Sequence, residues 1–174
     1  MVFPLRKQAA DEHGTGEHAT LRYSTAWAGG AARAADARRA LRAFLAHAPH
    51  SGRAPAPEPV VLDAELVVSE LIANAIRHAP GPCGLVLQLS DDELTITVWD
   101  TSAEEPVFRR PDRHRVGGHG LHLVRAASSK VSVIPSAAGK QITAHLRLDK
   151  NDSHTAIDRT VLPASLADGT PQSD

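Results

Sequence analysis

The sequence has 174 residues, 42% of them apolar, and a formal net charge of −1 at pH 7. This length suits one domain with its own core, and the near-zero charge argues against a general nucleic-acid binder. The single cysteine, Cys83, excludes an internal disulfide framework and a cysteine-based zinc site. There is no apolar stretch long enough to cross a bilayer and no signal-peptide core at the start, so we expect a cytoplasmic protein without a membrane or direct nucleic-acid partner.

The hydrophobic pattern predicts three helices and five strands within one domain over residues 18–149. In chain order we expect an edge strand at 21–24, helices at 31–48 and 60–78, strands at 84–89 and 94–99, a helix after Gly120, and strands at 130–134 and 141–148. Residues 1–17 are polar and aperiodic and are predicted to form a flexible arm. Residues 150–174 have no sustained period, which predicts a disordered tail.

The order of these elements indicates the fold class. Helices and strands are grouped along the chain and do not strictly alternate, and Ser90-Asp91-Asp92 is a hairpin signal between two strands. Such an order favours an α+β fold over a doubly wound parallel sheet. We therefore expect a two-layer α/β sandwich with helices over one mixed, mostly antiparallel sheet.

The second predicted helix has a polar face. At about 100° per residue, Glu70, Asn74 and His78 share one sector, with Asp63 and Arg77 beside them. The opposite face is apolar and must bury against the sheet, so the polar face looks away from it. A carboxylate one turn from an amide suits a metal–phosphate site, with the carboxylate as proton acceptor and the amide oxygen as Mg²⁺ ligand. A plain solvated face is the alternative.

Two further segments have the chemistry of a nucleotide site. Gly117, Gly118 and Gly120 surround His119 directly before an apolar helical turn. Glycines let backbone amides approach a ligand, and a helix N-terminus attracts anions, although most glycine-rich loops are plain connections. No Gly-Lys-Ser/Thr follows, so this is not a Walker A loop. Asp100 ends a strand, where it either meets water or accepts a hydrogen bond from the exocyclic amine of adenine.

Taken in order, these segments resemble the motifs of the histidine-kinase-like (GHKL) ATPases. Residues 70–78 resemble the N box, residues 100–106 resemble the first glycine box in its Asp-x-Ser-x-x-x-Pro variant, and residues 117–121 resemble the second glycine box. Gly139-Lys140 before a strand resembles the end of the domain. The resemblance covers roughly residues 21–148 and implies a Bergerat-type ATP-binding fold.

The resemblance also implies ligands and residue roles. ATP and Mg²⁺ would be bound, with Glu70 as general base, Asn74 as the Mg²⁺ ligand and Asp100 as the acceptor for adenine. The other nucleotide-binding residues that it implies are His78, Ser102, Gly117, Gly118, His119, Gly120, Leu121 and Gln141. Ser102 stands where many relatives have glycine, and Gln141 stands where a threonine often helps to hold adenine.

Among GHKL proteins, the chain resembles the stand-alone anti-sigma-factor serine kinases. Sensor histidine kinases need a helix pair before the N box, whereas one helix is predicted there, at 31–48. Topoisomerase and chaperone relatives need further domains after the N box, whereas a short tail is predicted after residue 149. The resemblance implies a serine/threonine kinase that phosphorylates a small antagonist (anti-anti-sigma) protein and sequesters a sigma factor, with Glu70 as base. Dimerisation is common among these relatives, which leaves a homodimer open.

Two other classes of function stay open as alternatives. One is a nucleotide-gated or nucleotide-free protein-binding module without kinase activity, for which Ser102 and Gln141 leave room. The other is a metalloprotein built on His114, His119 and His122, which is disfavoured because no acidic residue accompanies these histidines.

Overall fold

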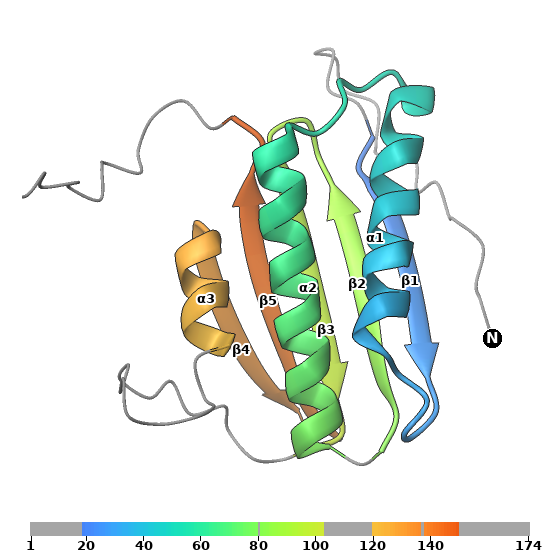
Figure 1. Ribbon diagram of the computed structural model, residues 1–174, viewed down its shortest axis with the longest axis vertical. Helices are drawn as coiled ribbons and strands as arrows, with labels where there is room; N and C mark the ends of the chain where they lie inside the picture. The colour runs from blue at the N-terminus through green and yellow to red at the C-terminus, as the bar shows by residue number, and fades with distance from the viewer. Residues whose placement is uncertain (1–18, 80, 103–119, 137, 150–174) are drawn as a thin grey trace, which may run out of the picture.

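The computed structural model describes residues 19–79, 81–102, 120–136 and 138–149. These residues form a two-layer sandwich in which three α-helices cover one face of an open five-stranded sheet (Figure 1). The helices are α1 (Ala34–His47), α2 (Glu58–His78) and α3 (Gly120–Ala127), and a short 3₁₀ helix, Ala48–Ser51, follows α1. The strands are β1 (Leu21–Trp27), β2 (Cys83–Leu89), β3 (Glu93–Asp100), β4 (Lys130–Ser136) and β5 (Gly139–Arg147).

The sheet has the strand order β1-β2-β3-β5-β4, and each of its four pairings is antiparallel. The predicted α+β sandwich is therefore confirmed, and these five strands contain no parallel pair. The alternation along β3 shows why the sheet has two different faces. Leu94, Ile96 and Val98 are buried under the helices, whereas the threonines between them are only partly buried, the pattern of a strand with one covered face.

Helix α2 lies at the centre of the helical layer and packs against α1, α3, β3 and β5. Of the five side chains predicted to face the sheet, Ala64, Val68, Ile72 and Ala75 are buried and Val61 is partly buried. The helix begins at Glu58, two residues earlier than predicted, because Pro59 lies in its first turn. The first amides of a helix have no partner within it, so proline costs no hydrogen bond there.

The topology brings several chain segments to one end of the sandwich. Strand β3 ends where β5 begins, and α2 also ends there, while α3 begins on the same side (the lower part of Figure 1). The predicted arm, the predicted tail and residues 103–119 lie outside the described residues. None of the helices in the described ranges is both long and apolar enough to cross a bilayer.

Candidate functional site

Asp100, the last residue of β3, lies at the centre of a buried polar cluster. Its Oδ1 accepts hydrogen bonds from the backbone N–H of Ser102 at 2.8 Å and from Nζ of Lys140 at 2.9 Å. The same ammonium donates to the carbonyl oxygen of Ser102 at 3.4 Å. The side chains of Asp100 and Lys140 are 3% and 4% exposed. Two charges are stable at this depth because they pair with each other and with backbone groups.

The register of the sheet explains how this cluster forms. Asp100 and Lys140 lie directly opposite each other in the β3–β5 ladder, so their side chains share the helix-covered face. The hydrogen bond that Asp100 accepts from the Ser102 amide forms an Asx-type turn, which redirects the chain as the strand ends. Gly139, which precedes Lys140, has φ +141°, and a Cβ there would collide with the carbonyl oxygen of Asp100. Only glycine lets β5 start this close to β3.

Cys83 is the partner of Asp100 in β2, on the other side of β3. Burial, and secondarily the negative charge of Asp100, raises the pKa of the Cys83 thiol. The thiol is therefore neutral at physiological pH, and it packs as a small apolar side chain beside Asp100. A nucleophilic role is disfavoured, because the thiolate is the reactive form.

Glu70 and Asn74 lie one turn apart on α2 and are partly buried, whereas His78 is exposed at the end of the helix. Gly120 begins α3, which packs alongside α2. A Cβ on Gly120 would collide with Oε2 of Glu70, so the glycine leaves the space that this carboxylate occupies. The tertiary structure thus places an acidic side chain beside the N-terminus of α3, where the helix dipole favours negative charge.

The remaining predicted residues are distributed differently. Leu121 is partly buried and packs on the core, and Ser102 is buried in the Asp100 cluster. Gln141 is exposed on the open face of the sheet, opposite to the face that carries Asp100. Its neighbour Lys140 occupies the position beside Asp100, and the sequence reasoning assigned it no role. Strand parity is the signal that finds it, because Lys140 shares a face with Ile142 and Ala144, which are both buried. Gly117, Gly118 and His119 lie outside the described residues.

The donor set of this end of the sandwich fits a magnesium nucleotide. A carboxylate at Asp100 suits an exocyclic amine, and the amide oxygen of Asn74 suits a hard cation such as Mg²⁺. In the described ranges, no group of three or more His, Cys, Asp or Glu side chains is placed to hold a metal ion. Mg²⁺ needs no such group, because it commonly binds one or two protein oxygens together with phosphate oxygens and water. Of the three histidines in the metalloprotein alternative, the structure describes His122.

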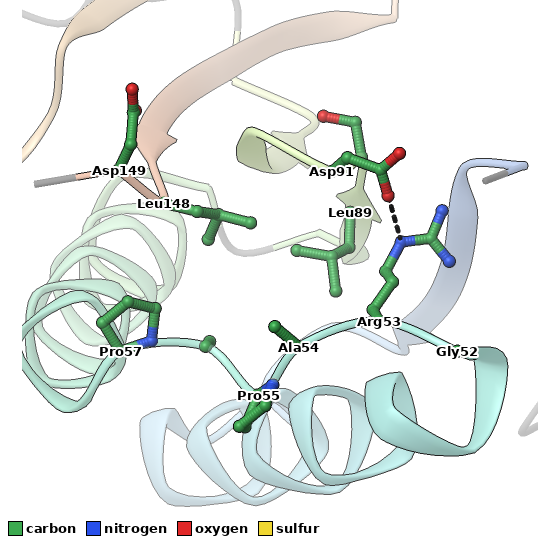
Figure 2. Close-up of a pocket in the computed structure, with 11 residues that line it drawn as sticks. Gly52, Arg53, Ala54, Pro55, Pro57, Leu89, Asp91, Leu148 and Asp149 are labelled. Atoms are coloured by element: carbon green, nitrogen blue, oxygen red, sulfur yellow. Dashed lines mark ion pairs between the residues drawn. The ribbon is translucent and has the colours of Figure 1, made fainter. Parts of the chain in front are cut away.

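A cavity of about 460 Å³ lies at the opposite end of the sandwich, between the α1–α2 connector and the β2–β3 turn (Figure 2). Arg53 is buried at its edge. Its Nη2 donates to the carbonyl oxygen of Ala19 at 2.6 Å, and its Nε lies 3.4 Å from Oδ1 of Asp91. Among the described residues, none that the sequence predicted for the nucleotide site lines this cavity. It is therefore separate from the cluster around Asp100.

Residues 30–146 match the family model described as the histidine kinase-like ATPase domain. Among solved structures, the fold is similar to the crystal structure of the RsbU and RsbW domains of Rv1364c from Mycobacterium tuberculosis, with 20% sequence identity and a TM-score of 0.52. That likeness covers 72% of this chain and 31% of the other chain. A search of curated proteins gave no match.

Proposed function

Because the chain belongs to the histidine kinase-like ATPase family, whose domains bind ATP, we propose that it is a regulatory serine/threonine kinase of the anti-sigma-factor type. Its substrate would be a serine or threonine of a small antagonist protein, and its second partner a sigma factor. The motifs in the sequence support this assignment. The similarity to a structure that contains an RsbW domain supports the same fold.

The observation that carries the proposal is the position of Glu70. Its carboxylate lies beside the first residue of α3 and one helical turn before Asn74. In the proposed reaction the partner hydroxyl attacks the γ-phosphorus of ATP and Glu70 takes the hydroxyl proton. The bond between that phosphorus and the β–γ bridging oxygen breaks, and ADP leaves. Asn74 would hold Mg²⁺, whose charge offsets that of the phosphates, and Asp100 would accept from the amine of adenine.

The first experiment measures binding of ATP with Mg²⁺ by calorimetry for the wild type, Asn74→Ala and Glu70→Gln. We expect saturable binding that weakens about tenfold or more in Asn74→Ala, because the loss of a metal ligand costs at least ~1.4 kcal/mol. Glu70→Gln should bind ATP like the wild type and lose transfer of labelled phosphate to a purified antagonist protein. Glu58→Gln, at an exposed position in the first turn of the same helix, is the matched control and should behave like the wild type.

Two outcomes would count against the kinase. Wild type that shows no saturable binding at about millimolar ATP favours the alternative, a nucleotide-free protein-binding module. Transfer that persists in Glu70→Gln contradicts the assignment of Glu70 as the base.

A further inference from the structure

We propose that Lys140 reads the nucleotide base directly by donating a hydrogen bond to N1 of adenine, beside the exocyclic amine that Asp100 accepts. The inference rests on the proposed ATP site. It adds a second hydrogen bond to the base, so that the site would recognise adenine through two neighbouring atoms. It gives a binding role to a residue on β5 whose ammonium group lies in hydrogen-bond contact with the predicted adenine acceptor.

The carboxylate of Asp100 is held through one of its two oxygens. In the described part of the chain, both of its hydrogen bonds fall on Oδ1, one from the Ser102 amide and one from Lys140. These two donors fix the orientation of the carboxylate. Oδ2 is then the oxygen that can accept from an exocyclic amine, so that the base and the lysine use different oxygens and do not compete.

The ammonium of Lys140 has more N–H donors than its contacts with Asp100 and Ser102 use. A lysine ammonium has three N–H donors and no acceptor. Within the described ranges one donor goes to Asp100 at 2.9 Å, and a second makes the longer contact of 3.4 Å to the Ser102 carbonyl. The third is available to a ligand atom. Because the side chain is 4% exposed, a hydrogen bond formed there is stronger than one made in water.

The Asp100–Lys140 pair is complementary to one edge of the adenine base. The Watson–Crick edge of adenine presents a donor, the exocyclic amine, directly beside an acceptor, the ring nitrogen N1. The Asp100–Lys140 pair presents an acceptor directly beside a donor, which is the opposite pattern. A buried site built to bond a ligand group disfavours an analogue that lacks it, because its own polar group is left without a partner.

The test compares three ligands on the full chain with Mg²⁺ present: ATP, 1-deaza-ATP, in which N1 is replaced by C–H, and 7-deaza-ATP, which is changed at the other edge of the base. We expect wild type to bind 1-deaza-ATP about tenfold or more weakly than ATP, the loss of one charged hydrogen bond. Lys140→Met should lower the affinity for ATP by a similar factor. This variant should bind ATP and 1-deaza-ATP with equal affinity. Its effect on 7-deaza-ATP should match its effect on ATP.

Lys130→Met, at the exposed start of β4, is the matched control and should keep the wild-type ratio between the ligands. Equal binding of ATP and 1-deaza-ATP by wild type would overturn the proposal, and this comparison stands even if Lys140→Met does not fold. ATP binding that tightens in Lys140→Met would also overturn it, since Lys140 would then compete with the base. If the wild type binds none of the three nucleotides, the ATP site itself is absent. That result would contradict the proposed function, whereas equal binding of ATP and 1-deaza-ATP contradicts the role of Lys140 alone.

Discussion

At the scale of single residues, Gly120 and Glu70 illustrate how the site depends on a missing side chain. The sequence marks Gly120 as part of a glycine-rich segment, which predicts close approach of backbone to a phosphate. The structure adds a second reason, because a Cβ at this position would meet the Glu70 carboxylate. No local pattern could show this contact, since the two residues are fifty positions apart and meet only when α3 packs on α2.

Replacing Gly120 by alanine should separate folding from function. Alanine is favoured over glycine in a helix, by about 1 kcal/mol at interior positions, and the atom it meets is the far end of a flexible side chain. We expect a free energy of unfolding within that margin of wild type, together with at least about tenfold slower phosphoryl transfer. Chemical denaturation and a transfer assay measure the two effects.

Ala126→Gly, at an exposed position of the same helix, is the control for helix propensity and should lose stability while keeping transfer. Wild-type transfer in Gly120→Ala would show that the position of the Glu70 carboxylate does not limit the reaction.

At the scale of elements, α1 and α2 are joined by polar contacts beside their buried faces. The guanidinium of Arg42 donates to both carboxylate oxygens of Glu65, with Nη2 2.8 Å from Oε2, and Nη1 of Arg38 donates to Ser69 Oγ at 3.0 Å. The hydrogen bonds from Arg42 hold the pKa of the Glu65 carboxyl below its usual value of 4.5. Glu65 therefore contributes stability while it is ionised, and this contribution is lost as the carboxyl is protonated.

Glu65→Gln should accordingly reduce the acid sensitivity of the fold. The wild-type contribution is fully present above pH 4.5, the unfolded value, and disappears as the pH falls through the lower folded value. Urea midpoints at about pH 6 and about pH 3 should differ less in Glu65→Gln than in wild type. Arg42→Met, which removes the donor and keeps the Glu65 carboxyl, is the comparison variant and should reduce the difference in the same way. An unchanged difference in Glu65→Gln would show that the Arg42 contact adds nothing to stability in solution.

The elements themselves were largely predictable, for a physical reason. Helical and strand periods reflect local backbone geometry, so each predicted helix and strand is present with its ends shifted by a few residues. The face of a single residue near a strand end was harder to assign. Gln141 was predicted to bind the nucleotide and lies on the open face, while Lys140 faces the helices. Parity in β5 is set by the buried Ile142 and by pairing with β3.

At the scale of the whole molecule, the two ends of the sandwich are built differently. One end holds the Asp100–Lys140 pair and the start of α3. The other holds the cavity in Figure 2, where Arg53 joins three segments that are distant in sequence: the chain before β1, the α1–α2 connector and the β2–β3 turn. Because these contacts lie at the opposite end of the sheet from Asp100, we expect them to support the fold without affecting nucleotide binding.

Arg53→Met should lower the free energy of unfolding by about 1–3 kcal/mol, because the partly buried carbonyl of Ala19 loses a charged donor. The affinity for ATP, measured below the unfolding transition, should stay at the wild-type value. Arg22→Met, at an exposed position of β1, is the control and should change neither quantity. A change of ATP affinity in Arg53→Met would reveal coupling between the two ends, and an unchanged urea midpoint would show that Arg53 does not support the fold.

The sequence by itself determined the order and type of the helices and strands, the α+β class, the apolar face of α2 and the three motifs that indicate a histidine-kinase-like ATPase. These features are local or depend only on order along the chain. The tertiary structure alone decided which residues meet: Asp100 with Lys140, forty residues apart, and Glu70 with Gly120, fifty residues apart. Such contacts depend on strand register and helix packing, which a one-residue slip would change and which no local period encodes.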